Sequence, residues 1–155
     1  MKAEDADYLA WLKSMMKQEL DLRPPSLARI GKNSIIIRSE SGKPVGHVTV
    51  SNRWQGFEIN SLLVDPAHRG KGLSHKLLDQ IEQSRVFCYT RDARLQSALV
   101  KAGYSRSRFP GVIATLNLIL TRTAMVAWML TTLDIKRFLH QIRHFPKYQL
   151  FIKKR

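Results

Sequence analysis

The residues with the clearest chemical potential form a short loop in the middle of the chain. The loop Arg69–Ser74 reads RGKGLS and follows an apolar run that ends at Asp65-Pro66. Glycine lets a backbone approach a ligand closely. The N–H groups that open a helix have no partner within it, and the helix dipole favours negative charge there. The loop therefore predicts a pyrophosphate site, with Arg69 and Lys71 adding positive charge.

A pattern this short also fits a plain turn between a strand and a helix, with charges that only contact solvent. It is not a nucleotide-binding P-loop, because the six-residue spacing and the Lys-Ser/Thr pair are missing. The neighbouring segments decide how much weight the loop carries.

Those segments predict strands and helices in a definite order. Runs rich in β-branched residues predict strands, and apolar residues three and four apart predict helices. Asp92 and Gly103 have the residue types that cap a helix at its two ends. The order indicates a mixed α/β sheet with crossover helices. The expected elements are a helix over 3–22, a hairpin of strands 34–38 and 45–51, a strand over 57–64, a helix from Gly72, a strand over 86–90 and a helix over 93–102.

Residues 112–133 form a long apolar stretch with Arg122 as its only charge. Its length would span a bilayer, but a central arginine and several threonines disfavour a membrane span. We expect instead a core strand over Val112–Leu120 and an amphipathic helix over Ala124–Ile142. A last strand over Tyr148–Ile152 follows, with a basic end.

The loop and its surroundings resemble the acetyl-CoA-binding motif of the GCN5-related N-acetyltransferase (GNAT) superfamily. That motif is Arg/Gln-x-x-Gly-x-Gly/Ala after a strand that ends in Val-Asp-Pro. Arg69 and Gly72 match it, and Ser74 stands where the family usually has Gly or Ala. The segment Lys101–Tyr104 is similar to the family's Lys-x-Gly-Phe signature. The resemblance covers roughly residues 34–104.

The resemblance implies a fold, a cofactor and a reaction. The fold is α/β (α+β), with a mixed, mostly antiparallel sheet flanked by helices, and with central strands that splay to leave a cleft. The cofactor is acetyl-CoA, and the reaction moves its acetyl group to a primary amine by direct attack. The implied cofactor-binding residues are Leu62, Leu63, Val64, Arg69, Gly70, Lys71, Gly72, Leu73 and Ser74.

Two residues are candidates for the proton transfers that this reaction needs. Glu58 lies on the strand where histone-acetylating relatives carry a catalytic glutamate, although it would equally fit a solvent-facing strand end. The tyrosine that many relatives use as an acid is replaced here by Leu99. Tyr89 is the candidate acid; Tyr104, bulk water or no acid at all are the alternatives, and Tyr104 is rather expected to pack in the core. Cys88, a lone cysteine in an apolar strand, is more typical of a core residue than of a nucleophile. The histidines show no metal-ligand spacing, so no metal is expected.

The net charge of the chain and its differences from the family pattern indicate which partners to expect. The chain carries a formal charge of +14, and its end has no acid after Asp134. This excess favours anionic partners, such as an acceptor carried on RNA or an acidic protein. We expect one domain over 1–155, with an atypical apolar and basic extension from about residue 105 that would border the cleft or form a homodimer face. The family's first strand is expected to be missing.

Two further expectations complete the hypothesis. A single cysteine cannot form an internal disulfide, which favours a reducing, cytoplasmic setting. The loss of the usual tyrosine at Leu99 keeps an alternative open, a non-catalytic regulatory protein that binds acetyl-CoA.

Overall fold

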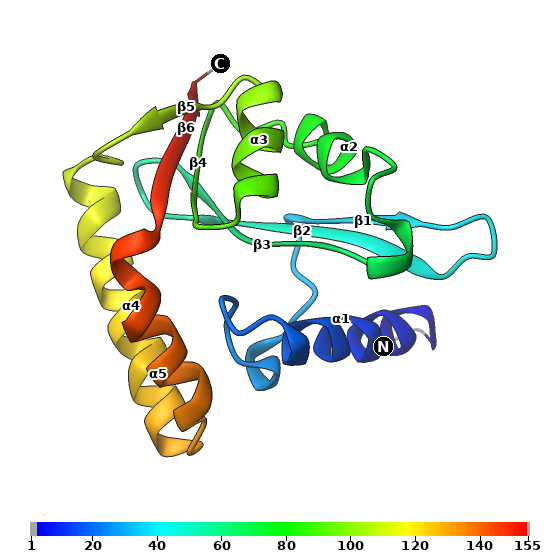
Figure 1. The fold of residues 1–155 in the computed structure, drawn as a ribbon, viewed down its shortest axis with the longest axis horizontal. Helices are drawn as coiled ribbons and strands as arrows, with labels where there is room; N and C mark the ends of the chain where they lie inside the picture. Colours follow the sequence, from blue (N-terminus) through cyan, green and yellow to red (C-terminus); the bar gives the residue numbers. More distant parts are fainter. Residues whose placement is uncertain (1–2, 155) are drawn as a thin grey trace.

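A mixed sheet organises the chain in the computed structural model, which describes residues 3–154 (Figure 1). Within that range the sheet has six strands in the order β1-β2-β3-β4-β6-β5, and only β3 and β4 run parallel. The expected mixed, mostly antiparallel sheet is therefore confirmed. Arg155, the last residue of the basic end, lies outside the described residues. The strands are β1 (Ser34–Arg38), β2 (Pro44–Asn52), β3 (Phe57–Val64), β4 (Arg85–Thr90), β5 (Ser105–Ser107) and β6 (Gln149–Lys154).

Helices cover both faces of the sheet (Figure 1). Helices α2 (Leu73–Asp79) and α3 (Ala93–Lys101) pack on one face over a core that includes Val48, Leu77 and Leu99. The other face carries α1 (Ala3–Gln18) and α4 (Val112–Thr131). Helix α1 is shorter than expected, because the chain turns at residues 20–22 before Pro24. The described chain begins with α1 at Ala3, so the expectation of a missing first strand falls outside the described residues.

The central strands β3 and β4 separate soon after they begin to pair. Their parallel pairing joins only Phe57 to Val86 and Glu58 to Phe87. Beyond this point β3 stays paired with β2, while β4 pairs with β6. Asn60 is an extra residue on β3, since Val50 pairs with Ile59 and Thr49 with Ser61. A bulge of this kind bends a strand and re-aims its side chains. The expected splay of the central strands is confirmed.

The structure corrects the prediction for the C-terminal part of the chain. Residues 112–120 form no strand; α4 is one continuous helix over Val112–Thr131, and α5 runs over Ile135–His144. The residues between them turn through Leu133, whose φ is 55°. The sequence pattern did not predict helix α4, because its outer face is as apolar as its inner face and the helical periodicity of apolar residues is therefore weak. By length and composition alone α4 is apolar enough to cross a membrane.

Candidate active site

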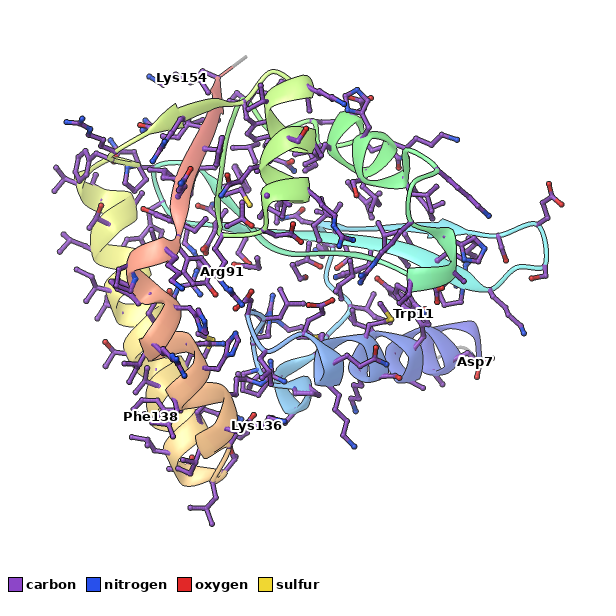
Figure 2. The ribbon with its side chains drawn as sticks, in the orientation of Figure 1. Asp7, Trp11, Arg91, Lys136, Phe138 and Lys154 are labelled. Atoms are coloured by element: carbon purple, nitrogen blue, oxygen red, sulfur yellow. The ribbon has the colours of Figure 1, made fainter. Side chains whose placement is uncertain are left out.

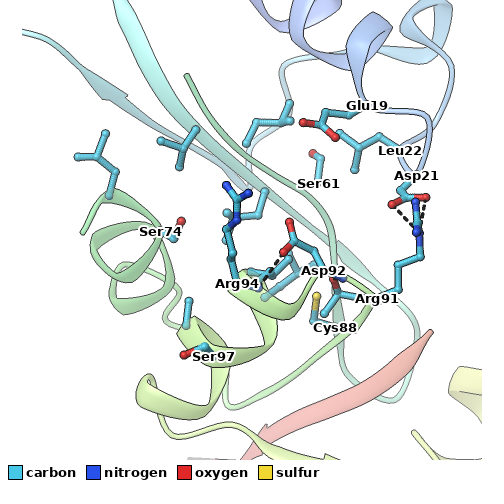
Figure 3. Close-up of a pocket in the computed structure, with 18 of the residues that line it drawn as sticks. Glu19, Asp21, Leu22, Ser61, Ser74, Cys88, Arg91, Asp92, Arg94 and Ser97 are labelled. Carbon is cyan, nitrogen blue, oxygen red and sulfur yellow. Dashed lines mark hydrogen bonds and ion pairs between the residues drawn. The ribbon is translucent and has the colours of Figure 1, made fainter. Parts of the chain in front are cut away.

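A cleft opens where β3 and β4 separate, with a volume of about 890 Å³. One wall is the stretch Ile59–Val64 of β3, and the other is Cys88–Asp92 with the first turns of α3. The glycine loop closes one end, and residues that follow α1 reach the cleft from the other face of the sheet. Figure 3 shows Ser74 and Asp21 at opposite sides of this space.

The glycine loop has the backbone shape that an anion site requires. Gly70 and Gly72 adopt φ values of 81° and 72°, and a Cβ added to either would meet open space. Any side chain at these positions is strained because L-residues rarely adopt such φ values. Gly72 is the N-cap of α2, and no side chain bonds to that end of the helix in the described structure. The open, glycine-shaped loop fits a pyrophosphate.

Most residues predicted for the cofactor line the cleft. Leu62, Leu63, Val64, Arg69, Gly70, Gly72, Leu73 and Ser74 all do so, but Lys71 does not. The Arg69 guanidinium donates to the carboxylate of Glu19 at 3.1 Å and to the Val64 carbonyl at 3.3 Å. Arg69 therefore braces the loop against the segment after α1. Figure 3 shows another arginine, Arg94, which projects into the cleft from the first turn of α3.

Glu58 is buried within an ion-pair network and does not line the cleft. Its side chain is 1% exposed, so the solvent-facing alternative is wrong. Oε2 accepts from Arg53 at 2.6 and 2.8 Å, and Oε1 accepts from Arg122 at 2.5 Å. Arg53 also donates to the side-chain oxygens of Asn60 and Asn117. Both carboxylate oxygens of Glu58 are thus engaged by guanidinium groups.

Arg122 connects this network to the cleft. Its side chain is 49% exposed and lines the cleft, although it comes from α4. Arg122 is the only charged residue in the apolar stretch 112–133. A single charge in such a stretch indicates that it pairs with another group, and this was the one clue to the ion pair in the sequence. The partner itself lies 64 residues away, and nothing local in the sequence identifies it.

Cys88 and Tyr89 of β4 border the cleft, whereas Leu99 and Tyr104 lie in the core. Tyr89 lines the cleft, and burial raises the pKa of its phenol. Leu99 is fully buried in the core and lies outside the cleft lining. Cys88 is buried, and burial raises the pKa of its thiol to about 12, so it is held as a neutral thiol. Tyr104 packs in the core, as expected.

A polar cluster that sequence analysis missed forms the far end of the cleft. Asp21 accepts from the Arg91 guanidinium at 2.9 Å and from the Tyr148 hydroxyl at 3.0 Å, and it lies 2.8 Å from His140 Nε2. These hydrogen bonds outweigh the effect of burial and lower the pKa of the Asp21 carboxyl. Figure 2 shows Arg91 between the sheet and the α4–α5 hairpin. The cluster joins three distant segments, so no local spacing predicts it.

The comparisons with known proteins agree with this geometry. The model of the acetyltransferase (GNAT) family matches residues 3–93, which is more than half of the chain. The chain belongs to the GNAT family. The enzyme is therefore an acetyl-CoA-dependent N-acetyltransferase, as its motif predicts. A search of curated proteins gives no match.

Solved structures share the fold of this enzyme. The Mycobacterium tuberculosis protein Rv2747, in complex with CoA and a second ligand, is 17% identical with a TM-score of 0.60, covering 95% of this chain and 93% of that one. N-acetylglutamate synthase from Neisseria gonorrhoeae, complexed with coenzyme A and N-acetyl-glutamate, is 14% identical with a TM-score of 0.61. That match covers 99% of this chain but only 33% of the synthase. Tetrahymena GCN5 is 18% identical with a TM-score of 0.51, covering 70% of this chain and 77% of that one.

The described site fits acetyl-CoA. The open glycine loop suits the pyrophosphate, and the exposed edge that β3 leaves at the splay suits the extended pantetheine arm. Among residues 3–154 no group of three or more His, Cys, Asp or Glu side chains could hold a metal ion.

Proposed function

We propose that the enzyme moves the acetyl group to a primary amine by direct attack, without an acetylated residue on the protein. The observation that carries this proposal is the splay of β3 from β4 beside the glycine loop, which leaves one cleft for both reactants. Acetyl-CoA supplies a thioester whose sulfur is the leaving group. Cys88, the only thiol in the chain, is buried with a raised pKa and makes a poor nucleophile.

Glu58 is the proposed base, and Arg122 controls access to it. An amine reaches the enzyme largely as an ammonium ion and must lose a proton before it attacks. Arg53 is largely buried and holds Oε2, whereas the half-exposed Arg122 holds Oε1 from the cleft side. A shift of the Arg122 side chain frees Oε1 toward the cleft. Glu58→Gln should therefore lower kcat, whereas Arg122→Gln should leave a working base.

Tyr89 is the proposed acid that protonates the departing thiolate. Burial raises the pKa of its phenol, so Tyr89 stays protonated at neutral pH and can donate. Tyr148 is a second tyrosine in the cleft, but its hydroxyl donates to Asp21. We expect Tyr89→Phe to lower kcat and Tyr148→Phe to leave kcat closer to wild type. The reverse order would assign the acid to Tyr148.

The acceptor is proposed to enter from the Asp21 end, opposite the glycine loop. Residues 101–155 carry eleven Lys and Arg against Asp134 alone, which supports an acceptor on an anionic carrier such as RNA or an acidic protein. An acceptor held by phosphates would lose affinity steeply as salt rises. A salt-independent KM for the acceptor would contradict the carrier and leave a small amine as the substrate.

The occupied oxygens of Glu58 favour a second candidate, a regulatory protein that binds acetyl-CoA without turnover. A thiol-reactive dye that measures free CoA, with a panel of amines, separates the two. Acetylation predicts amine-dependent CoA release that falls in Glu58→Gln. Binding of acetyl-CoA without release, for every amine in the panel, would contradict the enzymatic proposal.

A further inference from the structure

Helix α5 docks on the protein through its polar side. The Arg137 guanidinium is buried and donates to the backbone carbonyls of Met16, Glu19 and Leu22 at 2.8–3.0 Å. One turn later the Gln141 amide donates to the Leu20 and Leu22 carbonyls, both at 3.0 Å. The polar face of this amphipathic helix is therefore the face that packs inward.

The apolar side of α5 consequently points to solvent. Ile135, Leu139 and Ile142 recur at helical spacing and are 42%, 58% and 55% exposed. Phe145 continues the row just beyond the helix and is more exposed still. Figure 2 shows Phe138 and Lys136 on opposite sides of α5. A helix in water normally buries its apolar face. The orientation of α5 is the reverse, which indicates a surface that something else covers.

Helix α4 extends this uncovered surface. Arg122 is its only charged residue and is held by Glu58, so the outer side of α4 carries no charge. In the described residues, thirteen of the sixteen exposed large hydrophobic side chains lie between positions 109 and 145. Such a concentration marks an interaction surface. We call it the apolar hairpin face, made of the exposed side chains of Val112, Ile113, Leu116, Ile119, Leu120, Leu130, Leu133, Ile135, Leu139, Ile142 and Phe145.

Charge selects the kind of partner that covers this face. Residues 101–155 carry ten of the fourteen net positive charges, as eleven Lys and Arg against one acid. Lys136, Arg143 and Lys147 are exposed beside the apolar side chains of α5 and the segment that follows it. A second copy would bring the same positive charge. RNA covers protein surface by stacking its bases on aromatic side chains, and Phe145 is the only aromatic residue that defines this face. Lipid offers both an apolar layer and, in anionic membranes, negative headgroups.

We propose that the apolar hairpin face rests on an anionic lipid surface. The face lies in the headgroup region, and the flanking Lys and Arg side chains reach the headgroups. Helix α4 does not span the bilayer in this arrangement. Its inner side packs Ala114 and Leu118 against Phe87, and its Arg122 pairs with Glu58, contacts that a spanning helix would lose.

The test compares binding of the full chain to sedimenting vesicles of phosphatidylcholine alone and of phosphatidylcholine with phosphatidylglycerol. Wild type should sediment with the anionic vesicles and stay in the supernatant with the neutral ones. The variant Leu139→Ser with Ile142→Ser removes apolar surface without changing charge and should lose more than about tenfold in affinity. Val100→Ser is the control, because Val100 is 58% exposed on α3, away from this face, and it should bind as wild type does.

Three outcomes would overturn the proposal. The first is wild type that stays in the supernatant with anionic vesicles. The second is a double variant that binds them as tightly as wild type, which would leave only nonspecific attraction between charges. The third is a stable wild-type dimer in analytical ultracentrifugation that the double variant turns into monomer without any vesicle binding. Circular dichroism of both variants confirms that they are folded.

Discussion

Replacing Glu58 with glutamine removes the carboxylate that neutralises Arg53 and Arg122. The change keeps the size of the side chain but places an amide N–H₂ against one of the guanidinium groups. Breaking a buried ion pair by removing one partner costs about 3–5 kcal/mol, whereas an exposed pair contributes about 0–1 kcal/mol. Arg53 is 13% exposed and Arg122 is 49% exposed, so nearly all of the loss comes from Arg53. We expect Glu58→Gln to lower the free energy of unfolding by about 3 kcal/mol.

Urea unfolding followed by circular dichroism measures this loss. Glu19→Gln is the matched control, because it removes the same charge from the exposed ion pair with Arg69 and should cost less than about 1 kcal/mol. Adding Arg53→Met to Glu58→Gln should recover part of the stability, since it removes the uncompensated charge. A Glu58→Gln protein within about 0.5 kcal/mol of wild type would refute the buried network.

Three further predictions follow from other parts of the structure. Burial lowers the pKa of His47 from 6.5 to about 4, so the unfolded chain takes up a proton at a higher pH than the folded protein. Stability should therefore fall by about 3 kcal/mol as pH drops from 6.5 to 4. In the variant His47→Gln, the free energy of unfolding should depend less on pH. Urea unfolding at several pH values measures this, and the same pH dependence in wild type and variant would contradict the prediction. Cys88 should resist a thiol-reactive dye in the native protein and react only after unfolding; prompt native labelling would show that it is accessible. Gly42 has a φ of 78°, within the left-handed region, whereas Gly111 has a φ of 115° and a ψ of 154°, a conformation that is essentially restricted to glycine. Gly42→Ala should cost about 1 kcal/mol and Gly111→Ala clearly more, and equal thermal unfolding midpoints would contradict this difference.

The elements that sequence analysis predicted well are those with local signals. The β1–β2 hairpin, the glycine loop and α3 each follow from turn residues, caps or apolar spacing within a few positions. Gly70 and Gly72 adopt the positive φ values that glycine allows. The conformation of the loop could therefore be predicted from the residue types at these two positions.

The elements that it missed depend on contacts between distant segments or on a partner outside the chain. Helix α4 looked like a strand because both of its sides are apolar, and one of them faces away from the protein. The Glu58–Arg122 pair and the Asp21 cluster join residues 64 and more positions apart. No local spacing encodes such pairs, although a single arginine in an apolar stretch indicates that one exists.

Acetyl-CoA binding at the glycine loop is central to the function of this enzyme. Isothermal titration of acetyl-CoA into wild type, Gly72→Glu and Gly42→Glu tests it directly. Both variants add the same charge at a glycine with positive φ and open space, but only Gly72 lies in the loop. We expect Gly72→Glu to weaken binding by at least about thirtyfold, roughly 2 kcal/mol, and Gly42→Glu to bind as wild type does. Equal affinities for wild type and Gly72→Glu would contradict the assignment of the cleft.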